Sequence, residues 1–151
     1  MQYHLAQLNI ARGKGLIDDP IMAEFVANLD RINALAESHE GFIWRLKSDS
    51  GNATDIQAFD DPHLIVNLSV WKSVETLKEF TYKTAHVGIM RQRKKWFHVL
   101  KEAYVVLWWI PAGHIPTIQE AIDKLNLLRE KGSTPEAFDF RQIFPAPVGE
   151  E

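Results

Sequence analysis

The chain of 151 residues contains no cysteine. This absence excludes disulfides, thiol catalysis, cysteine-based zinc sites and iron–sulfur clusters, and it suits a reducing compartment. The N-terminus lacks the charged start and apolar core of a secretory signal, and no stretch approaches the roughly 20 apolar residues that span a bilayer. We therefore expect a cytoplasmic protein with no membrane partner.

Motifs for several common kinds of chemistry are also absent. The six histidines show neither HxxxH nor HxH spacing, so the sequence predicts no metal site. The chain has no G-x-S-x-G, no P-loop and no G-x-G-x-x-G. A net charge of −3 does not indicate a nucleic-acid partner, and the basic run 91–95 is typical of a solvated helix face.

The chain is long enough to form a folded domain, and it is rich in aromatic residues. A domain of this size buries roughly two-thirds of its unfolded surface, so it folds without disulfides or metal. Five Trp and eight Phe bring large buried areas and can shape a pocket. We predict one domain over residues 1–134, followed by an aromatic and proline-rich tail over 135–151 that lies on the surface or on a partner.

Four segments have the pattern of strands, and four have the pattern of helices. The strands are predicted over residues 3–10, 42–47, 64–71 and 104–110, with a long loop over 48–63. The helices are predicted over residues 19–40, 73–84, 85–100 and 118–131. Gly41 closes the first helix because glycine can take the left-handed cap conformation, and Gly132 ends the last.

This order of elements predicts an α+β fold of the ferredoxin-like kind. Its four-stranded antiparallel sheet would carry helices on one face, plus an extra C-terminal helix. Ile65, Trp71 and either Trp108 or Trp109 would then leave an apolar patch on the sheet, and such a patch predicts a partner surface. A homodimer that pairs two sheets as a dimeric α/β barrel would bury this patch.

The helix predicted over 85–100 carries polar residues on its apolar face. His86, Met90, Arg93, Phe97 and Leu100 recur at spacings of four, three, four and three, so they share one side. In the functional interpretation, Arg93 binds an anionic group and His86 acts as a base or as a metal or haem ligand. In the structural interpretation, Arg93 pairs with an acidic side chain or a helix end, and His86 caps backbone carbonyls.

Other residues are candidates for the same cavity. Asn67 and Ser69 either line it, with Asn67 orienting a substrate oxygen, or hydrogen-bond across the sheet. His114 faces the cavity or bonds its own turn, and the tryptophans either form a wall or serve core packing and dimer contact. The predicted catalytic residues are His86, Arg93 and Asn67. The predicted ligand-binding residues are Trp71, Trp96, Trp109, His114, Phe80, Met90 and Ser69.

Several motifs carry a resemblance to known families. NLSVW (67–71), the His86 helix, LWW-x-PAGH-x-PT (107–117) and TPEAF (134–138) resemble, over nearly the whole chain, a bacterial family described as domain of unknown function 3291. That family lies in the dimeric α/β-barrel superfamily of antibiotic-biosynthesis monooxygenases. VWKS (70–73), Phe80 and the pair Ala85-His86 are similar to the haem-degrading members of this superfamily.

The resemblance implies a small-molecule enzyme or binding protein that holds a hydrophobic or aromatic ligand between sheet and helices. Cofactor-independent oxygenation and proton transfer are the implied reactions. The haem-degrading relatives imply an alternative, a haem-binding protein with His86 as proximal ligand. Phe80 aligns with their catalytic Trp, and Gln7 or Asn9 with an Asn of their first strand. No other cofactor is predicted, and a non-catalytic dimeric module is the third interpretation.

Overall fold

The computed structural model describes residues 2–16, 18–46, 63–83, 93–98, 100 and 103–147. Its elements in chain order are β1 (Tyr3–Gly13), a 3-10 helix (Pro20–Met22), α1 (Ala23–Ser38), β2 (Phe42–Arg45), β3 (Leu64–Trp71), α2 (Val74–Lys83), α4 (Arg93–Trp96), β4 (Phe97–His98), β5 (Val105–Pro111) and α5 (Ile118–Lys131). Within these ranges, no helix is long and apolar enough to cross a membrane. The predicted loop lies outside them, apart from His63.

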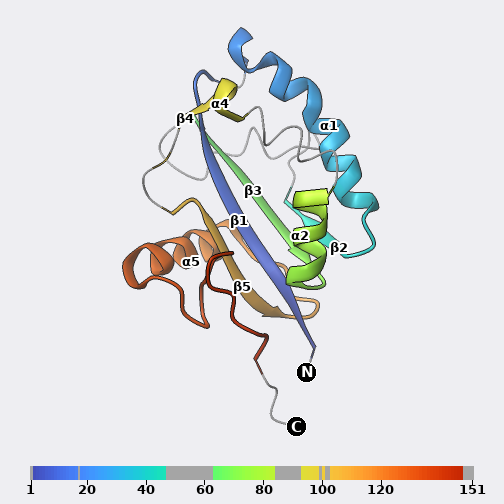
Figure 1. Cartoon of the computed structure of the whole chain (residues 1–151), viewed down its shortest axis with the longest axis vertical. Coiled ribbons are helices and arrows are strands. Elements are labelled where there is room, and N and C mark those ends of the chain that lie inside the picture. The colour runs from blue at the N-terminus through green and yellow to red at the C-terminus, as the bar shows by residue number, and fades with distance from the viewer. Residues whose placement is uncertain are drawn as a thin grey trace.

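β1 is the central strand of one antiparallel sheet (Figure 1). β3 pairs with one edge of β1, and β2 pairs with the far edge of β3. The other edge of β1 is shared, because β5 pairs with residues 3–9 and β4 with Arg12 and Gly13. The order β2-β3-β1-β5 is that of a ferredoxin-like sheet, so the predicted α+β fold is confirmed.

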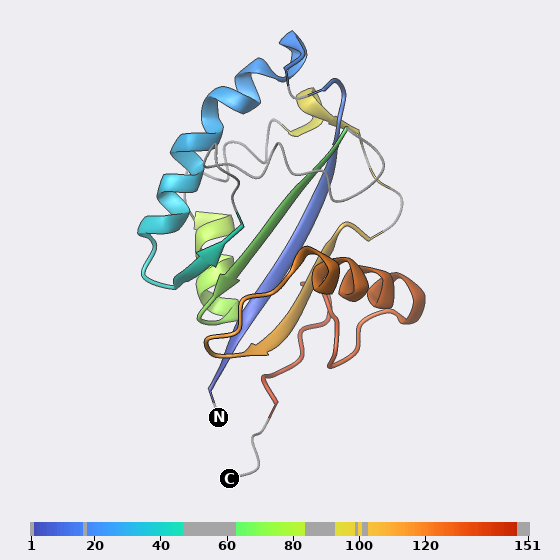
Figure 2. The ribbon, with the colours of Figure 1, turned by 180° about the vertical axis from the view of Figure 1, so that it is seen from behind.

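Side chains along each strand alternate between the two faces of the sheet, and different helices pack on each face. Leu5 of β1 and Trp71 of β3 pack in one cluster with Leu77 of α2. Leu8 and Leu68 point the other way and pack in a second cluster with residues of α5. Figures 1 and 2, which view the molecule from opposite sides, show α2 and α5 on opposite faces of the sheet. Odd-numbered residues of β1 and β3 therefore face α1 and α2.

The extra C-terminal helix begins and ends where the sequence predicts. Thr117 is its N-cap, and the Thr117 Oγ1 accepts a hydrogen bond from the Glu120 backbone N at 3.0 Å. Gly132 follows its last residue with φ +74°, a conformation that favours glycine, and its N–H donates to the Leu128 carbonyl at 2.8 Å. Local capping chemistry thus defines both ends of α5.

The position of α5 overturns the prediction of an apolar patch on the sheet. Leu125 of α5 is fully buried, and Trp108 beneath the helix is only 1% exposed. On the opposite face Trp71 is 2% exposed, because α2 packs on it. Both tryptophans are covered by their own chain, so the patch gives no argument for a partner surface.

Residues after Gly132 fold back onto β5 instead of lying only on the surface. Leu107 and Phe138 exchange both backbone hydrogen bonds, at 2.7 and 2.9 Å, which pairs part of the outer edge of β5. Phe138 is fully buried, and Trp109 Nε1 donates to the Phe144 carbonyl at 2.9 Å. Part of the predicted tail therefore packs into the core of this chain.

The helix predicted over 85–100 is wrong in its last residues. Phe97 and His98 form β4, because they pair with Gly13 and Arg12 at the far end of β1. Phe97 therefore does not share a helical face with Arg93, and the described helical residues end at Trp96. The predicted apolar side therefore does not extend to Phe97, and His86 and Met90 lie outside the described residues.

Candidate ligand-binding site

A cavity of about 240 Å³ lies between the sheet and helices α1 and α2. Odd-numbered residues of β1, β3 and β5 form its floor, both helices contribute to its wall, and Phe140 of the tail also lines it. This volume is smaller than the roughly 300–1,000 Å³ of most drug-sized ligand sites. It equals about eight water molecules at roughly 30 Å³ each. The cavity suits a ligand of one or two rings.

A hydrogen-bonded row of polar side chains crosses the floor of the cavity. Gln7 Nε2 donates to Asn67 Oδ1 at 2.6 Å and to Ser69 Oγ at 2.7 Å. Trp71 Nε1 donates to the same Ser69 Oγ at 2.8 Å. Both acceptor positions of the serine oxygen are then used, so its O–H is left to donate. We call Gln7, Asn67, Ser69 and Trp71 the polar row.

Strand register brings the polar row together. Gln7 lies opposite Ser69, and Asn9 lies opposite Asn67, in the antiparallel pairing of β1 with β3. The four residues of these two pairs are odd-numbered on their strands, so they project from the same face of the sheet. Asn9 Oδ1 is buried and has no hydrogen-bond partner among the described residues. The floor thus holds both hydrogen-bond donors and an unused acceptor.

Aromatic rings form one wall of the cavity. Trp71 and Phe80 are stacked, with ring centroids 5.2 Å apart and an interplanar angle of 29°. Phe42 meets Trp71 edge to face, with centroids 5.6 Å apart. All three rings line the cavity. Because stacked and edge-to-face arrangements are the favourable geometries for aromatic groups, a flat ligand would continue the same packing.

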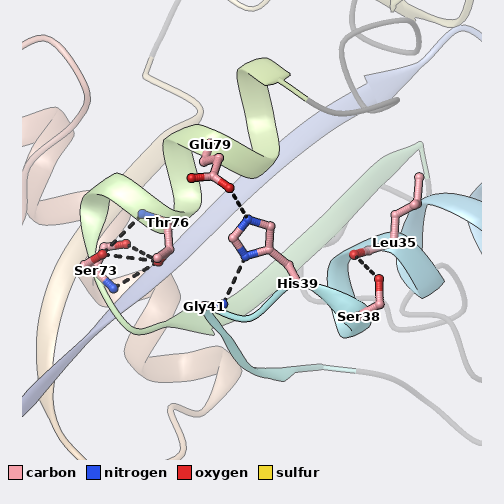
Figure 3. A network of polar contacts seen from close by, with 7 residues as sticks. All are labelled: Leu35, Ser38, His39, Gly41, Ser73, Thr76 and Glu79. Atoms are coloured by element: carbon pink, nitrogen blue, oxygen red, sulfur yellow. Dashed lines mark hydrogen bonds and ion pairs between the residues drawn. The ribbon is translucent and has the colours of Figure 1, made fainter.

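His39 supports this aromatic wall from outside the cavity lining. Its ring meets Trp71 and Phe80 edge to face, with centroids 5.6 and 6.3 Å apart. His39 Nδ1 accepts a hydrogen bond from the Gly41 backbone N at 3.0 Å, so in the neutral ring Nε2 carries the hydrogen and donates to Glu79 Oε1 at 3.3 Å (Figure 3). The imidazole therefore links the end of α1 to α2 behind the wall.

Arg45 places a positive charge at the cavity. It is the last residue of β2, lies opposite Ser69 in the pairing with β3, and lines the cavity. Its Nε and Nη2 both donate to one oxygen, Glu37 Oε1, at 3.3 and 3.2 Å. The side chain of Arg45 is 11% exposed, whereas that of Glu37 is 41% exposed. The guanidinium is thus mostly buried beside a carboxylate that reaches the solvent.

Four of the predicted site residues line this cavity: Asn67, Ser69, Trp71 and Phe80. The alternatives for Asn67 and Ser69 were lining a cavity or bonding across the sheet. In the structure they do both, because Gln7 on the neighbouring strand is their shared donor.

Three predicted residues lie elsewhere. Trp96 is buried in a separate cluster around the 3-10 helix. Trp109 packs against the tail through its bond to the Phe144 carbonyl. His114 Nε2 lies 2.7 Å from Glu120 Oε1 and ties the turn after β5 to the start of α5. None of the three is among the described residues that line the cavity.

The remaining predicted residues fall outside the description. His86 and Met90 lie in the segment 84–92, which the structure does not describe. Arg93 is described only as the first backbone position of α4. Their assignment as base, anion anchor and wall therefore stays a prediction.

Sequence reasoning missed Gln7 and Arg45 as members of the cavity. A signal for Gln7 was present, since Gln7 and Asn9 are polar at alternate positions of an otherwise apolar strand, as Asn67 and Ser69 are on β3. Phe42 faces the cavity, and residues three apart in a regular strand face opposite sides of the sheet. Strand alternation therefore predicts that Arg45 faces away from the cavity.

Comparisons with known proteins give a family and several similar structures. The family described as domain of unknown function (DUF3291) matches residues 4–151. No curated protein matches the chain. PA3566 from Pseudomonas aeruginosa is 12% identical with a TM-score of 0.48, covering 73% of this chain and 94% of that one. NE2512, a protein of unknown function from Nitrosomonas europaea, is 12% identical with a TM-score of 0.48, and the match covers 77% of this chain and 97% of that one. SnoaB, a cofactor-independent oxygenase from Streptomyces nogalater, is 14% identical with a TM-score of 0.45, and the match covers 74% of this chain and 95% of that one.

Proposed function

We propose that this chain, which belongs to the DUF3291 family of domains of unknown function, binds a small aromatic molecule between its sheet and helices α1 and α2. The observation that carries the proposal is the polar row beneath an aromatic wall. Gln7 and Ser69 are buried, and buried polar side chains cost free energy unless they are hydrogen-bonded. Here the hydrogen bonds satisfy some of these groups and leave others unused inside a cavity.

The unused groups indicate the chemistry of the ligand. Asn67 Oδ1 accepts from Gln7, which leaves the Asn67 amide N–H groups to donate. The Ser69 O–H is left to donate in the same way, and Asn9 Oδ1 is left to accept. A ligand that carries a carbonyl or ring oxygen together with a hydroxyl would complement all three. A plain hydrocarbon would leave them without partners, which lowers its affinity.

We propose proton transfer or cofactor-independent oxygenation as the reaction, if the bound molecule is a substrate. Eight of the sixteen described lining residues are apolar, and exclusion of water by these side chains around a bound ligand would favour both kinds of chemistry. The polar row would hold the oxygen of an anion formed when the ligand loses a proton. Among the described lining residues, only Arg45 and Tyr104 are titratable, so neither a carboxylate nor an imidazole is present there to act as base. His86 remains the proposed base.

The haem alternative does not fit the described cavity. Its volume of about 240 Å³ lies below the range for drug-sized ligands, and haem is larger than most of those. The lining residues that the structure describes include no imidazole or sulfur ligand for iron. Self-association stays part of the proposal, but contact through the second sheet face would involve α5, since α5 lies on that face.

Asn67→Leu tests the contribution of the polar row to binding. We expect the affinity for 2-naphthol to fall several-fold, up to about tenfold, because one hydrogen bond contributes about 0.5–1.5 kcal/mol. The affinity for naphthalene should stay within twofold, since it has no oxygen. Ligand-detected NMR titration measures both dissociation constants.

Asn126→Leu on α5 is the matched control for this variant. It makes the same change at an exposed position outside the cavity, so both affinities should equal those of the unmodified protein. Equal loss of naphthol binding in the two variants, or no binding of either compound to the unmodified protein, would contradict the proposed function.

A further inference from the structure

Gln7 is a buried amide whose hydrogen bonds all involve its nitrogen. The residue lies on the cavity floor and is 7% exposed. Nε2 donates to Ser69 Oγ at 2.7 Å and to Asn67 Oδ1 at 2.6 Å, which uses both of its hydrogens. The Asn67 backbone carbonyl, 3.5 Å from the same nitrogen, can only accept, so the nitrogen and not the oxygen of the amide faces this group. No described residue donates to Gln7 Oε1, which is therefore left to accept.

Ser69 is a buried donor whose direction is set by its neighbours. The residue is 6% exposed and lines the same cavity. An indole N–H can only donate, so Ser69 Oγ is the acceptor in its 2.8 Å bond with Trp71 Nε1. The bond from Gln7 fills the second acceptor position, and the hydroxyl hydrogen takes the direction that remains around the oxygen. No described residue accepts this hydrogen, so the cavity floor holds a donor that is already oriented.

The unused donor and the unused acceptor are neighbours. Gln7 and Ser69 lie opposite each other in the pairing of β1 with β3, and their 2.7 Å bond fixes the amide beside the hydroxyl. Gln7 Oε1 belongs to the same planar amide group as the bonded nitrogen, so it also lies close to the Ser69 hydroxyl. A ligand that fits this pair needs a donor and an acceptor side by side.

We infer that the ligand is a small fused-ring lactam, in which a ring N–H stands beside a carbonyl, and that Gln7 is the residue that selects it. This inference rests on the proposed function and specifies its ligand. The lactam N–H would donate to Gln7 Oε1, and the lactam oxygen would accept from the Ser69 hydroxyl. Its rings would contact Trp71 and Phe80 of the aromatic wall, and the cavity volume suits two rings.

Other oxygen-containing rings fit the pair less well. A phenol has a single oxygen that must donate to Gln7 and accept from Ser69 at the same time. A lactone has the carbonyl but no N–H, so it leaves Gln7 Oε1 without a donor. A buried polar group that loses its partner in this way lowers the affinity of the complex.

The experiment compares 2-quinolone with coumarin, which have the same fused rings and the same carbonyl. They differ in one ring position, which is N–H in 2-quinolone and oxygen in coumarin. Isothermal titration calorimetry on the full chain measures both dissociation constants. We expect 2-quinolone to bind about 5- to 100-fold more tightly, because coumarin leaves a buried acceptor unpaired. 2-Naphthol, which has a similar size, should also bind less tightly than 2-quinolone.

Three variants make the result specific to Gln7. Gln7→Met removes the acceptor at nearly constant size, so the preference for 2-quinolone over coumarin should fall below about threefold. Ser69→Ala removes the donor to the carbonyl that both compounds share, so both should lose affinity several-fold while the preference remains. Gln119→Met is the matched control at an exposed position of α5 outside the cavity, and it should leave both affinities unchanged. Circular dichroism melting curves establish that each variant is folded.

The outcomes separate this inference from the proposed function. If coumarin or 2-naphthol bound the unmodified protein as tightly as 2-quinolone, the lactam assignment would be overturned while cavity binding stayed in place. A preference that survives in Gln7→Met would overturn the selecting role of Gln7. Failure of all three compounds to bind would overturn the inference and the proposed function together.

Discussion

Gly41→Ala is expected to lower the free energy of unfolding by about 3 kcal/mol, the upper end of typical overpacking costs. A Cβ atom at position 41 would lie less than 3 Å from Cβ, Cγ2 and Oγ1 of Thr76 in α2. Thr76 cannot turn away freely, because its Oγ1 accepts from the Ser73 backbone N at 3.2 Å and donates to the Ser73 carbonyl at 3.0 Å (Figure 3). The turn after α1 and the start of α2 would have to separate.

Urea unfolding of the two proteins measures this change, provided that the unfolding slope stays constant. Thr76→Gly removes the atoms in conflict, at a cost of about 1 kcal/mol for glycine in a helix. The double variant should then be clearly more stable than the sum of the single losses predicts, since the two residues are in contact. Glu40→Ala, at the exposed neighbouring position, should change stability by less than about 0.5 kcal/mol. A loss below 1 kcal/mol in Gly41→Ala would contradict the close approach.

Leu125→Ala is expected to lower the free energy of unfolding by 2–5 kcal/mol, the range for a buried leucine, and about 3 kcal/mol is the central value. Leu125 is fully buried between α5 and the sheet, in the cluster that contains Leu8, Leu68 and Trp108. Truncation leaves a cavity that rigid strands cannot fill. Because the covering helix belongs to the same chain, the loss should not depend on protein concentration.

Leu127→Ala is the matched control on the same helix. Leu127 is only half-buried, so the same truncation should cost clearly less than at Leu125. Thermal unfolding at several protein concentrations completes the test. If the loss in Leu125→Ala grew as the protein was diluted, the face under α5 would be stabilised by a second subunit, contrary to the packing described above.

The sequence by itself determined the type and order of most elements. Capping chemistry and glycine are local, so Thr117 and Gly132 define α5 without information from the rest of the chain. The alternation of β3 is equally local, and it correctly placed Asn67, Ser69 and Trp71 on one face. This was enough to predict a cavity between sheet and helices with three of its lining residues.

Local patterns were misleading where a distant segment decides the conformation. Helical spacing extended through Phe97, but pairing with Gly13 makes it a strand residue. Gly41 was expected in the left-handed cap conformation, yet it does not have a positive φ, and His39 is the C-cap of α1. Glycine is needed there because Thr76, 35 positions later, occupies the space of a side chain.

Only the tertiary structure decided which faces are covered and which charge enters the cavity. The periodicity of α5 shows that one side is apolar, but either sheet face could receive it, because burial of apolar area has no direction. Likewise, a one-residue bulge moves every later side chain of a strand to the opposite face of the sheet. Nothing in the local sequence of β2 indicates the bulge that the structure contains. Arg45 therefore becomes a cavity residue through its pairing with β3.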